Sequence, residues 1–185
     1  MTSISFSQIK GKSILIIGEV GTGKTRLTQQ LMNEAIEMGV KGITVIDLAP
    51  KAINVNGSSI GGLLLEKPDQ RIRYMAPKEI KTPRLTARNA EELLELADKN
   101  KLEIDIILNA FNMTPSEVLF VNDVSIYLQR GELEKLLGAF SRAKTVVANG
   151  YLGERLREDF STGVSLRERS LILKMADRMD KVIRL

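Results

Sequence analysis

Short unbroken apolar runs alternate along this chain with longer stretches in which apolar residues recur every three or four positions. The runs typical of buried β-strands are Ser13–Ile17, Ile43–Leu48, Val118–Val121, Thr145–Ala148 and Lys181–Leu185. Strands that alternate with helical segments form parallel sheets, because each crossover helix returns the chain to the same edge. The pattern therefore predicts an α/β fold, a three-layer, doubly wound and mostly parallel sheet.

Helical spacing fills the intervals between these runs. The segment from Gly23 to Met38 is apolar at every third or fourth position, and Gly39 stands where a helix often ends in a left-handed glycine. The segment Leu102–Phe111 fits a continued helix or a strand equally well. Further helices are predicted from a capping-box pattern at Asn89–Glu92, from the composition of Gly131–Ser141, and from a second capping-box pattern at Ser165–Glu168.

One segment breaks the alternation. Glycine, asparagine, serine and proline are too dense in Lys51–Pro68 for a core element, so a long loop is predicted there. Arg71–Met75 has the composition of a short strand, and prolines bracket the connection that follows it. We therefore expect residues 1–185 to form a single domain with a long loop insertion at about residues 50–88.

The composition removes several kinds of chemistry. The chain has no cysteine and no histidine, which excludes disulfides, zinc ribbons, thiol nucleophiles and a histidine general base. Acid–base chemistry would therefore depend on carboxylates, lysine, tyrosine or water. Lysine and arginine number 27 against 23 acidic residues, but the cations are dispersed among acids along the chain. This pattern favours a solvated surface over a nucleic-acid-binding stripe.

Nothing in the sequence predicts a membrane-associated protein. Met1–Ser13 lacks a basic start followed by a long apolar run, so no signal peptide is expected. No segment approaches the roughly 20 apolar residues that a membrane-spanning helix needs. A cytoplasmic location is the expectation that follows.

The strongest chemical signal is the segment Gly18–Thr25, which fits the pattern G-x-x-x-x-G-K-[ST] at every fixed position. Glycines let such a loop wrap a phosphate with its backbone N–H groups, and the following helix adds the positive end of its dipole. Lys24 would reach the terminal phosphates, and the Thr25 hydroxyl would bind Mg²⁺. The predicted nucleotide-binding residues are Gly18, Glu19, Val20, Gly21, Thr22, Gly23, Lys24, Thr25 and Arg26.

This motif, with a predicted strand before it and a predicted helix after it, resembles that of the P-loop NTPase superfamily. The resemblance implies ATP and Mg²⁺ as ligands and a second motif in which an apolar strand ends in an aspartate. Val118–Asp123 is similar to that motif, with Asn122-Asp123 in place of the usual Asp-Glu pair. Asp123 either lies beside the metal, with Val124 where a catalytic glutamate would be, or acts as the base while Asn122 takes the metal side. In both registers Asp123 is expected near Mg²⁺.

Two more polar residues stand at predicted strand ends. Asn149 resembles the polar sensor of RecA-like, additional-strand P-loop ATPases, which implies a third catalytic role beside Lys24 and Asp123. That resemblance implies the strand order last strand, P-loop strand, Thr145 strand, Val118 strand, Ile43 strand. Asp47 ends the second strand, where open α/β sheets bind ligands, and is a candidate for the metal shell with Thr25 and Asp123. A turn-capping role is the alternative for both Asn149 and Asp47.

Guanidinium groups match phosphate oxygens, so several arginines are further candidates for a phosphate clamp. These arginines are Arg84, Arg88, Arg142, Arg155 and Arg167. Adenine is favoured over guanine as the base, because the chain has no Asn-Lys-x-Asp segment.

The sequence supports a Mg²⁺-dependent ATPase with slow hydrolysis, acting as an energy-coupling or switch subunit, in a homo-oligomer or with a protein partner. An ATP-dependent small-molecule transferase or kinase is the first alternative, because the order of elements is loosely similar to that of the corrinoid adenosyltransferases. A nucleotide-binding module without significant turnover is the second alternative, supported by the absence of a glutamate after Asp123.

Overall fold

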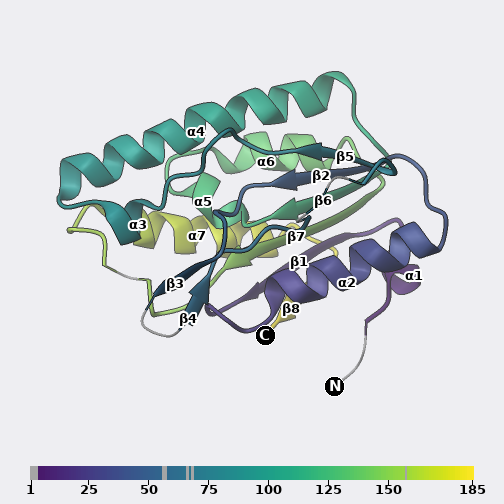
Figure 1. Cartoon of the computed structure of the whole chain (residues 1–185), viewed down its shortest axis with the longest axis horizontal. Coiled ribbons are helices and arrows are strands. Elements are labelled where there is room, and N and C mark those ends of the chain that lie inside the picture. The colour runs from purple at the N-terminus through teal and green to yellow at the C-terminus, as the bar shows by residue number, and fades with distance from the viewer. Residues whose placement is uncertain (1–3, 56–57, 66, 68, 157) are drawn as a thin grey trace.

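The computed structural model describes residues 4–55, 58–65, 67, 69–156 and 158–185. Its strands are β1 (Ser13–Gly18), β2 (Ile43–Asp47), β3 (Ile53–Val55), β4 (Ser58–Ile60), β5 (Ile72–Met75), β6 (Val118–Asn122), β7 (Thr145–Tyr151) and β8 (Lys181–Arg184) (Figure 1). Its helices are α1 (Phe6–Ile9), α2 (Lys24–Glu37), α3 (Pro83–Thr86), α4 (Ala90–Met113), α5 (Val124–Leu128), α6 (Leu133–Phe140) and α7 (Val164–Ala176).

The main sheet has six strands in the order β5-β2-β6-β7-β1-β8, and every neighbouring pair is parallel. The α/β fold with a parallel sheet is thus confirmed, as is the order of the five strands that the sequence predicted. Strand β5 extends the sheet beyond β2. Because all six strands run the same way, their carboxyl ends lie at one edge of the sheet.

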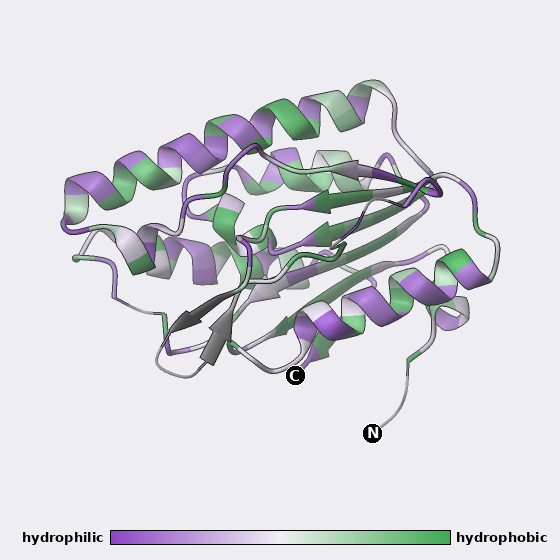
Figure 2. Cartoon of the chain, viewed as in Figure 1, coloured by the Kyte–Doolittle hydropathy of each residue, from purple (hydrophilic) through white to green (hydrophobic). Residues whose placement is uncertain are grey.

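Helices cover both faces of this sheet (Figure 1). Helices α1 and α2 pack on one face over a core that includes Phe6, Leu31 and Phe120. Helices α4, α5, α6 and α7 pack on the other face over a core that includes Leu119 and Tyr127. The central strands are buried on both sides, which accounts for their unbroken apolar runs, whereas the helices alternate apolar and polar residues (Figure 2).

The structure decides one alternative that the sequence left open and departs from the sequence predictions at other elements. The ambiguous stretch Leu102–Phe111 continues α4, which is 24 residues long. The predicted loop Lys51–Pro68 contains an antiparallel pair, β3 with β4, that is separate from the main sheet. Residues 56, 57, 66 and 68 of that segment lie outside the described residues. The short helices α1 and α5 were not predicted, because four or five residues are too few to show a helical period.

The capping box predicted at Ser165 is wrong. Helix α7 begins two residues earlier, at Val164 after Gly163, whose φ of 78° is in the left-handed region. Ser165 is therefore already helical, and the Glu168 side chain is buried against other segments instead of capping the helix. The capping box predicted at Asn89 is confirmed in part, because the Asn89 side chain accepts a hydrogen bond from the backbone N–H of Glu92 at 2.9 Å.

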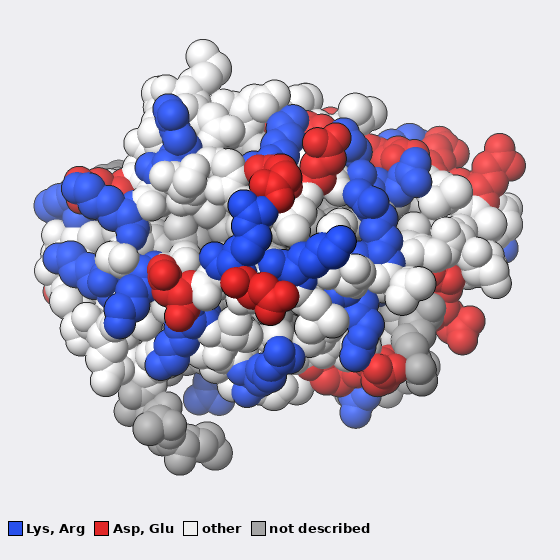
Figure 3. Space-filling model, turned by 180° about the vertical axis from the view of Figure 1, so that it is seen from behind, with Lys and Arg blue, Asp and Glu red and all other residues white. Residues whose placement is uncertain are grey.

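Surface features agree with the predicted charge distribution. On the face shown in Figure 3, acidic side chains lie among the basic ones, which leaves no large area of a single sign. Among the residues described, no helix has the length and apolar character needed to cross a bilayer.

Candidate nucleotide site at the carboxyl edge of the sheet

The loop between β1 and α2 has the backbone shape that phosphate binding requires. Gly21 and Gly23 have φ angles of 77° and 95°, which lie in the left-handed region where a side chain would be strained. Helix α2 begins at Lys24 directly after Gly23. The two glycines therefore turn the chain so that the first N–H groups of a 14-residue helix face outward from the end of β1.

These N–H groups are available to a ligand. Within the described chain, the backbone N–H groups of Gly21, Gly23, Lys24 and Thr25 have no acceptor. The first N–H groups of any helix lack a partner within the helix, and here no side chain caps them. A row of free donors at the positive end of a helix is a ready site for an anion.

Lys24 lies beside these donors. Its Nζ donates a hydrogen bond to the backbone carbonyl oxygen of Glu19 at 2.6 Å. Burial lowers the pKa of Lys24, and the carboxylates of Asp123 and Glu19 act in the opposite direction. Among the described residues, the Lys24 ammonium has a single hydrogen bond, to a carbonyl oxygen of the loop itself, so a phosphate oxygen can replace that carbonyl.

The loop forms one wall of a cleft of about 580 Å³, which is in the size range of small-molecule sites. Residues on the connection after β2 and at the ends of β6 and β7 complete the cleft. The lining residues outside the loop are Arg26, Gln29, Ala49, Lys51, Ala52, Gly61, Gly62, Leu63, Asn122, Asp123, Asn149, Tyr151 and Leu156. Figure 1 shows α3 and the β3–β4 pair beyond the carboxyl edge of the sheet.

Asp123 lies in the cleft wall at the end of β6. Its φ of 57° is left-handed, and its backbone N–H donates to Asn149 Oδ1 at 3.0 Å. The Ser125 hydroxyl donates to Asp123 Oδ1. Burial raises the pKa of Asp123, while the Ser125 hydrogen bond and the charges of Lys24 and Arg84 oppose that shift.

The donor set suits a divalent cation that is shared with a ligand. Within the described chain, the Thr25 hydroxyl and Asp123 Oδ2 have no hydrogen-bond partner, and both residues line the cleft. A hydroxyl and a carboxylate oxygen are ligands that Mg²⁺ accepts, with phosphate oxygens and water completing the shell. Over the residues described, no group of three or more acidic side chains could hold a metal ion by itself. A metal here would therefore depend on ligand phosphates.

The side chain of Asn149 is fully used within the protein. Its Oδ1 accepts the Asp123 N–H, and its Nδ2 donates to Thr28 Oγ1 and Asn122 Oδ1, both at 2.9 Å. Asn149 thus ties α2 and β6 to the end of β7. These contacts favour a role in positioning Asp123, and the sensor role remains a prediction.

Replacing Asn149 by alanine should lower the free energy of unfolding by about 2–4 kcal/mol, because three buried or half-buried polar groups lose their partner. Denaturant unfolding of Asn149→Ala measures this loss. The matched control is Asn109→Ala, which removes an exposed asparagine of α4. Equal stability of the two variants would contradict the positioning role.

Asp47 is less accessible than a metal ligand would be. The residue is 1% exposed, and its two oxygens accept hydrogen bonds from Asn122 Nδ2 at 2.7 Å, the Leu64 N–H at 2.7 Å and the Tyr74 hydroxyl at 3.0 Å. Burial raises the pKa of this carboxyl, and the hydrogen bonds that it accepts act in the opposite direction. Asp47 anchors the connection after β2 to the sheet, and its place in a metal shell remains a prediction.

Glu19 fastens the segment after β7 to the loop. Its Oε2 accepts the N–H groups of Glu154 at 2.7 Å and Arg155 at 3.2 Å, and its Oε1 accepts the Val20 N–H at 2.7 Å. Burial raises the pKa of Glu19, but these N–H groups outweigh it and hold the pKa below its usual value. A Cβ on Gly153 would clash with the Glu19 carboxylate, which three N–H groups hold in place, so this close approach favours glycine.

Glu19→Gln should loosen that segment. A neutral amide has one acceptor oxygen where the carboxylate has two, so at least one of the three N–H groups loses its partner. We expect the amides of Glu154 and Arg155 to exchange with solvent deuterium about tenfold faster. Hydrogen exchange followed by mass spectrometry measures this rate, and Glu37→Gln, at an exposed position, is the control. Unchanged exchange in both variants would show that Glu19 does not hold the segment.

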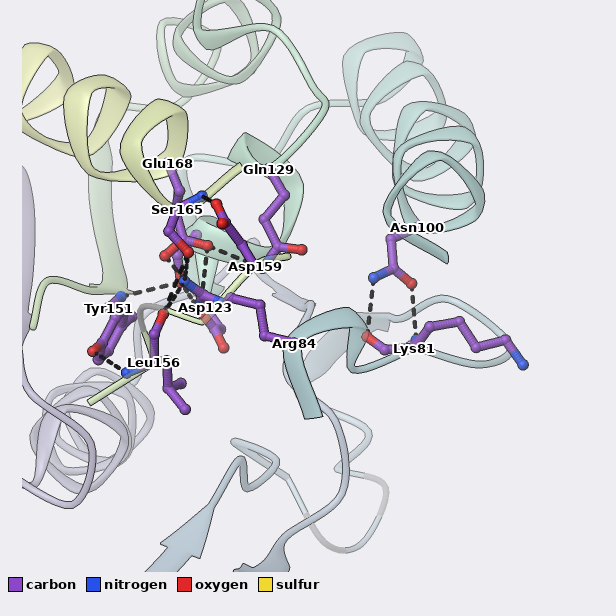
Figure 4. A network of polar contacts seen from close by, with 11 residues as sticks. Lys81, Arg84, Asn100, Asp123, Gln129, Tyr151, Leu156, Asp159, Ser165 and Glu168 are labelled. Carbon is purple, nitrogen blue, oxygen red and sulfur yellow. Dashed lines mark hydrogen bonds and ion pairs between the residues drawn. The ribbon is translucent and has the colours of Figure 1, made fainter. Parts of the chain in front are cut away.

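Sequence reasoning missed a buried polar network at one side of the cleft (Figure 4). The Arg84 guanidinium pairs with the Glu168 carboxylate at 3.0 Å, and the two side chains are 8% and 2% exposed. Arg84 also donates to the Leu156 carbonyl oxygen at 2.8 Å and lies 5.4 Å from the centre of the Tyr151 ring. Glu168 additionally accepts from Gln129 Nε2 at 3.0 Å. The sequence pointed to this network only in that Arg84 was one of the five arginines predicted as candidates for binding phosphate.

The other four candidate arginines have contacts outside this network. Arg88 pairs with Glu92 on the surface, and Arg142 and Arg167 donate to the backbone oxygens of Asn112 and Gly131. The backbone N–H of Arg155 is held by Glu19.

Glu168 should make stability depend on pH. Burial raises its pKa to about 7, while Arg84 and Gln129 act in the opposite direction and Asp123 adds to the rise. The folded state then keeps a proton that the unfolded state releases above about pH 4.5, so stability falls as pH rises from about 4.5 to 7. Glu168→Gln should remove up to roughly 3 kcal/mol of this change. Unfolding free energies across this range test it, and an unaltered slope in the variant would contradict it.

Comparisons with known proteins add little to this geometry. No family model and no curated protein matches the chain. Among solved structures, the chain is similar to flagellar accessory protein FlaH from Methanocaldococcus jannaschii, with 12% identity over 95% of this chain and 71% of that chain and a TM-score of 0.45. It is also similar to a Pyrococcus horikoshii OT3 protein, with 10% identity over 98% and 87% and a TM-score of 0.41. With TM-scores below 0.5, neither likeness assigns a function to this chain.

Proposed function

We propose that this protein is a P-loop NTPase of the RecA-like kind that binds ATP with Mg²⁺ and hydrolyses it slowly, as an energy-coupling or switch ATPase. The observation that carries the proposal is the set of free N–H groups of Gly21, Gly23, Lys24 and Thr25, next to the Lys24 ammonium, in the wall of a cleft of ligand size. Together with the sheet order, this arrangement has the parts needed to bind a phosphate chain.

Each cleft residue has a definite task in the proposal. The loop N–H groups and Lys24 hold and orient the phosphates, and Lys24 exchanges the Glu19 carbonyl for a phosphate oxygen. The Thr25 hydroxyl and the Asp123 carboxylate would hold Mg²⁺, which neutralises phosphate charge when bound. Asn149 fixes the backbone of Asp123 through the Asp123 N–H.

Slow hydrolysis follows from the lack of a second carboxylate. Asp123 is the only acidic residue in the described wall of the cleft, and Val124, in the next position, is fully buried. A carboxylate that binds a metal ion is a weak base, so no side chain here is free to deprotonate water efficiently. We expect a turnover rate below about 1 s⁻¹, at the low end of the range for enzymes.

Titration calorimetry with ATP, ADP and GTP, each with and without Mg²⁺, tests the proposal. We expect ATP to bind, Mg²⁺ to strengthen binding, and GTP to bind more weakly. A phosphate-release assay on the same samples measures the turnover rate. Failure to bind any of the three nucleotides in either condition would overturn the proposed function.

A small-molecule transferase is the second candidate, and a neighbouring cavity favours it. A cavity of about 470 Å³ at the start of α7 shares the Tyr151 and Leu156 side chains with the cleft. This space would accept an acceptor molecule beside the nucleotide. The two candidates differ in one measurable respect, because an ATPase consumes ATP alone, whereas a transferase consumes it only when an acceptor is present.

Mass spectrometry distinguishes the two candidates. Protein and ATP are incubated with or without a small-molecule extract, and Lys24→Ala serves as the inactive control. Consumption of ATP only with extract, together with a new modified compound, would favour the transferase. Release of ADP and phosphate at the same rate in both samples would favour the ATPase.

A further inference from the structure

Arg84 is an unusual residue in this fold because a cation is buried on the short helix of an insertion. It belongs to α3, and its side chain points into the group formed by Glu168, Ser165 and Tyr151 (Figure 4). Removing an arginine and a glutamate from water is costly, and apolar side chains of similar volume would hold the two segments together as well. A buried ion pair next to a ligand cleft therefore points to a task beyond packing.

The surroundings of Arg84 connect it with the nucleotide cleft. Arg84 lines a small cavity of about 50 Å³ that also includes Asp123, Gln129 and Tyr151 in its wall. Asp123 and Tyr151 are at the same time part of the wall of the cleft, where Lys24 lies. Asp123 is thus at the boundary between two spaces, with Lys24 in the wall of the cleft and Arg84 in the wall of the small cavity.

The small cavity contains an unused acceptor. Gln129 is 2% exposed, its Nε2 donates to Glu168, and its Oε1 has no hydrogen-bond partner. A buried acceptor without a donor is rare in folded proteins, and Gln129 is part of the wall of this cavity. Glu168 keeps its bond to Gln129 even when Arg84 is displaced, so the pair can separate without leaving the carboxylate with no donor.

We propose that Arg84 recognises the terminal phosphate of the bound triphosphate. Its guanidinium pairs with Glu168 when that phosphate is absent, and it contacts a γ-phosphate oxygen beside Asp123 when the triphosphate is bound. This inference rests on the proposed nucleotide binding and adds a residue that determines specificity for triphosphate over diphosphate. The loop holds the inner phosphates and Lys24 reaches the β- and γ-phosphates, so ATP differs from ADP in the γ-phosphate, which brings extra negative charge toward Asp123 and Arg84. A planar guanidinium fork suits phosphate oxygens well.

The arrangement makes a prediction about affinity rather than about folding. A ligand shifts the position of Arg84 only if it binds one position more tightly than the other, and ATP and ADP differ in the phosphate that Arg84 would contact. Loss of Arg84 should therefore weaken ATP binding by about 10- to 100-fold, the effect of a lost charge-assisted hydrogen bond. Binding of ADP should stay unchanged.

The test is calorimetric titration of MgATP and MgADP into wild type, Arg84→Gln and the control Arg88→Gln. Arg88 lies in the same segment but pairs with Glu92 on the surface, so its variant should keep the wild-type ratio of ATP to ADP affinity. Because Arg84→Gln leaves Glu168 buried with one partner fewer, the double variant Arg84→Gln/Glu168→Gln is measured as well. We expect it to bind ADP like wild type and to have lost the preference for ATP.

Two results would overturn the inference while the proposed function stands. One is a double variant whose ATP and ADP affinities both equal those of wild type, and the other is a double variant that loses both affinities to the same extent, as a purely structural role would predict. If wild type binds neither nucleotide, the proposed function fails and this inference fails with it.

Discussion

Lys24→Ala should bind ATP about 100-fold more weakly than wild type. The Lys24 ammonium would contact two phosphate groups, and each lost charge-assisted bond contributes about 1.5 kcal/mol or more. The fold should be unaffected, because within the described part of the chain Lys24 Nζ has one hydrogen bond, to the Glu19 carbonyl oxygen. Titration calorimetry measures the affinity, and thermal unfolding checks that the variant is folded.

The matched control for this prediction is Lys41→Ala. Lys41 is exposed and precedes β2, at the opposite edge of the sheet from the cleft, so its removal lowers the net charge equally without touching the site. If both variants lose affinity to the same extent, general electrostatic attraction explains the binding of ATP and the assigned role of Lys24 is wrong.

Asp123→Asn should remove most of the Mg²⁺ dependence of ATP binding. The amide keeps the volume of the carboxylate and can still accept the Ser125 hydrogen bond, but it loses the charged oxygen that favours a divalent cation. We expect Mg²⁺ to strengthen ATP binding to wild type about 10- to 100-fold more than to the variant, the range for loss of one group at a metal site. Titrations in Mg²⁺ and in EDTA give both values.

Asp69→Asn is the control for the loss of a carboxylate. Asp69 pairs with Arg71 on the connection that leads to β5, and it is absent from the wall of the cleft. The Mg²⁺ dependence of this variant should equal that of wild type. A Mg²⁺ effect of full size in Asp123→Asn would show that another group holds the metal.

Much of the fold was predictable because its signals are local. Residues such as Leu119 and Val147 lie in strands buried on both faces, and burial of this kind leaves an unbroken apolar run that can be read without knowledge of the partner strands. The glycines of the loop are likewise required by backbone angles at Gly21 and Gly23 themselves. The order of five strands followed from the resemblance that the motif and Asn149 suggested, and the structure confirms that order.

The polar network beside the cleft was beyond sequence reasoning for a physical reason. Arg84 and Glu168 meet across 84 positions of sequence, and the pattern around each residue has a more ordinary explanation. Ser165–Glu168 has the pattern of a capping box, a serine followed three positions later by a glutamate. The same pattern arises when the glutamate is buried and pairs with a distant arginine. Only the contact of Arg84 in α3 with Glu168 in α7 distinguishes them. The hydrogen bonds of Asn149 and Asp47 are also non-local. The sequence could therefore predict that these residues lie at strand ends, but not which groups their side chains bond to.

The central claim is that the main chain between β1 and α2 holds a phosphate, and amide NMR spectra of ¹⁵N-labelled protein test it most directly. On addition of MgATP, the amide resonances of Gly21, Gly23, Lys24 and Thr25 should shift strongly, while that of Gly138 in α6 should stay in place. Loop resonances that remain unchanged at a concentration where calorimetry shows saturation would contradict the claim.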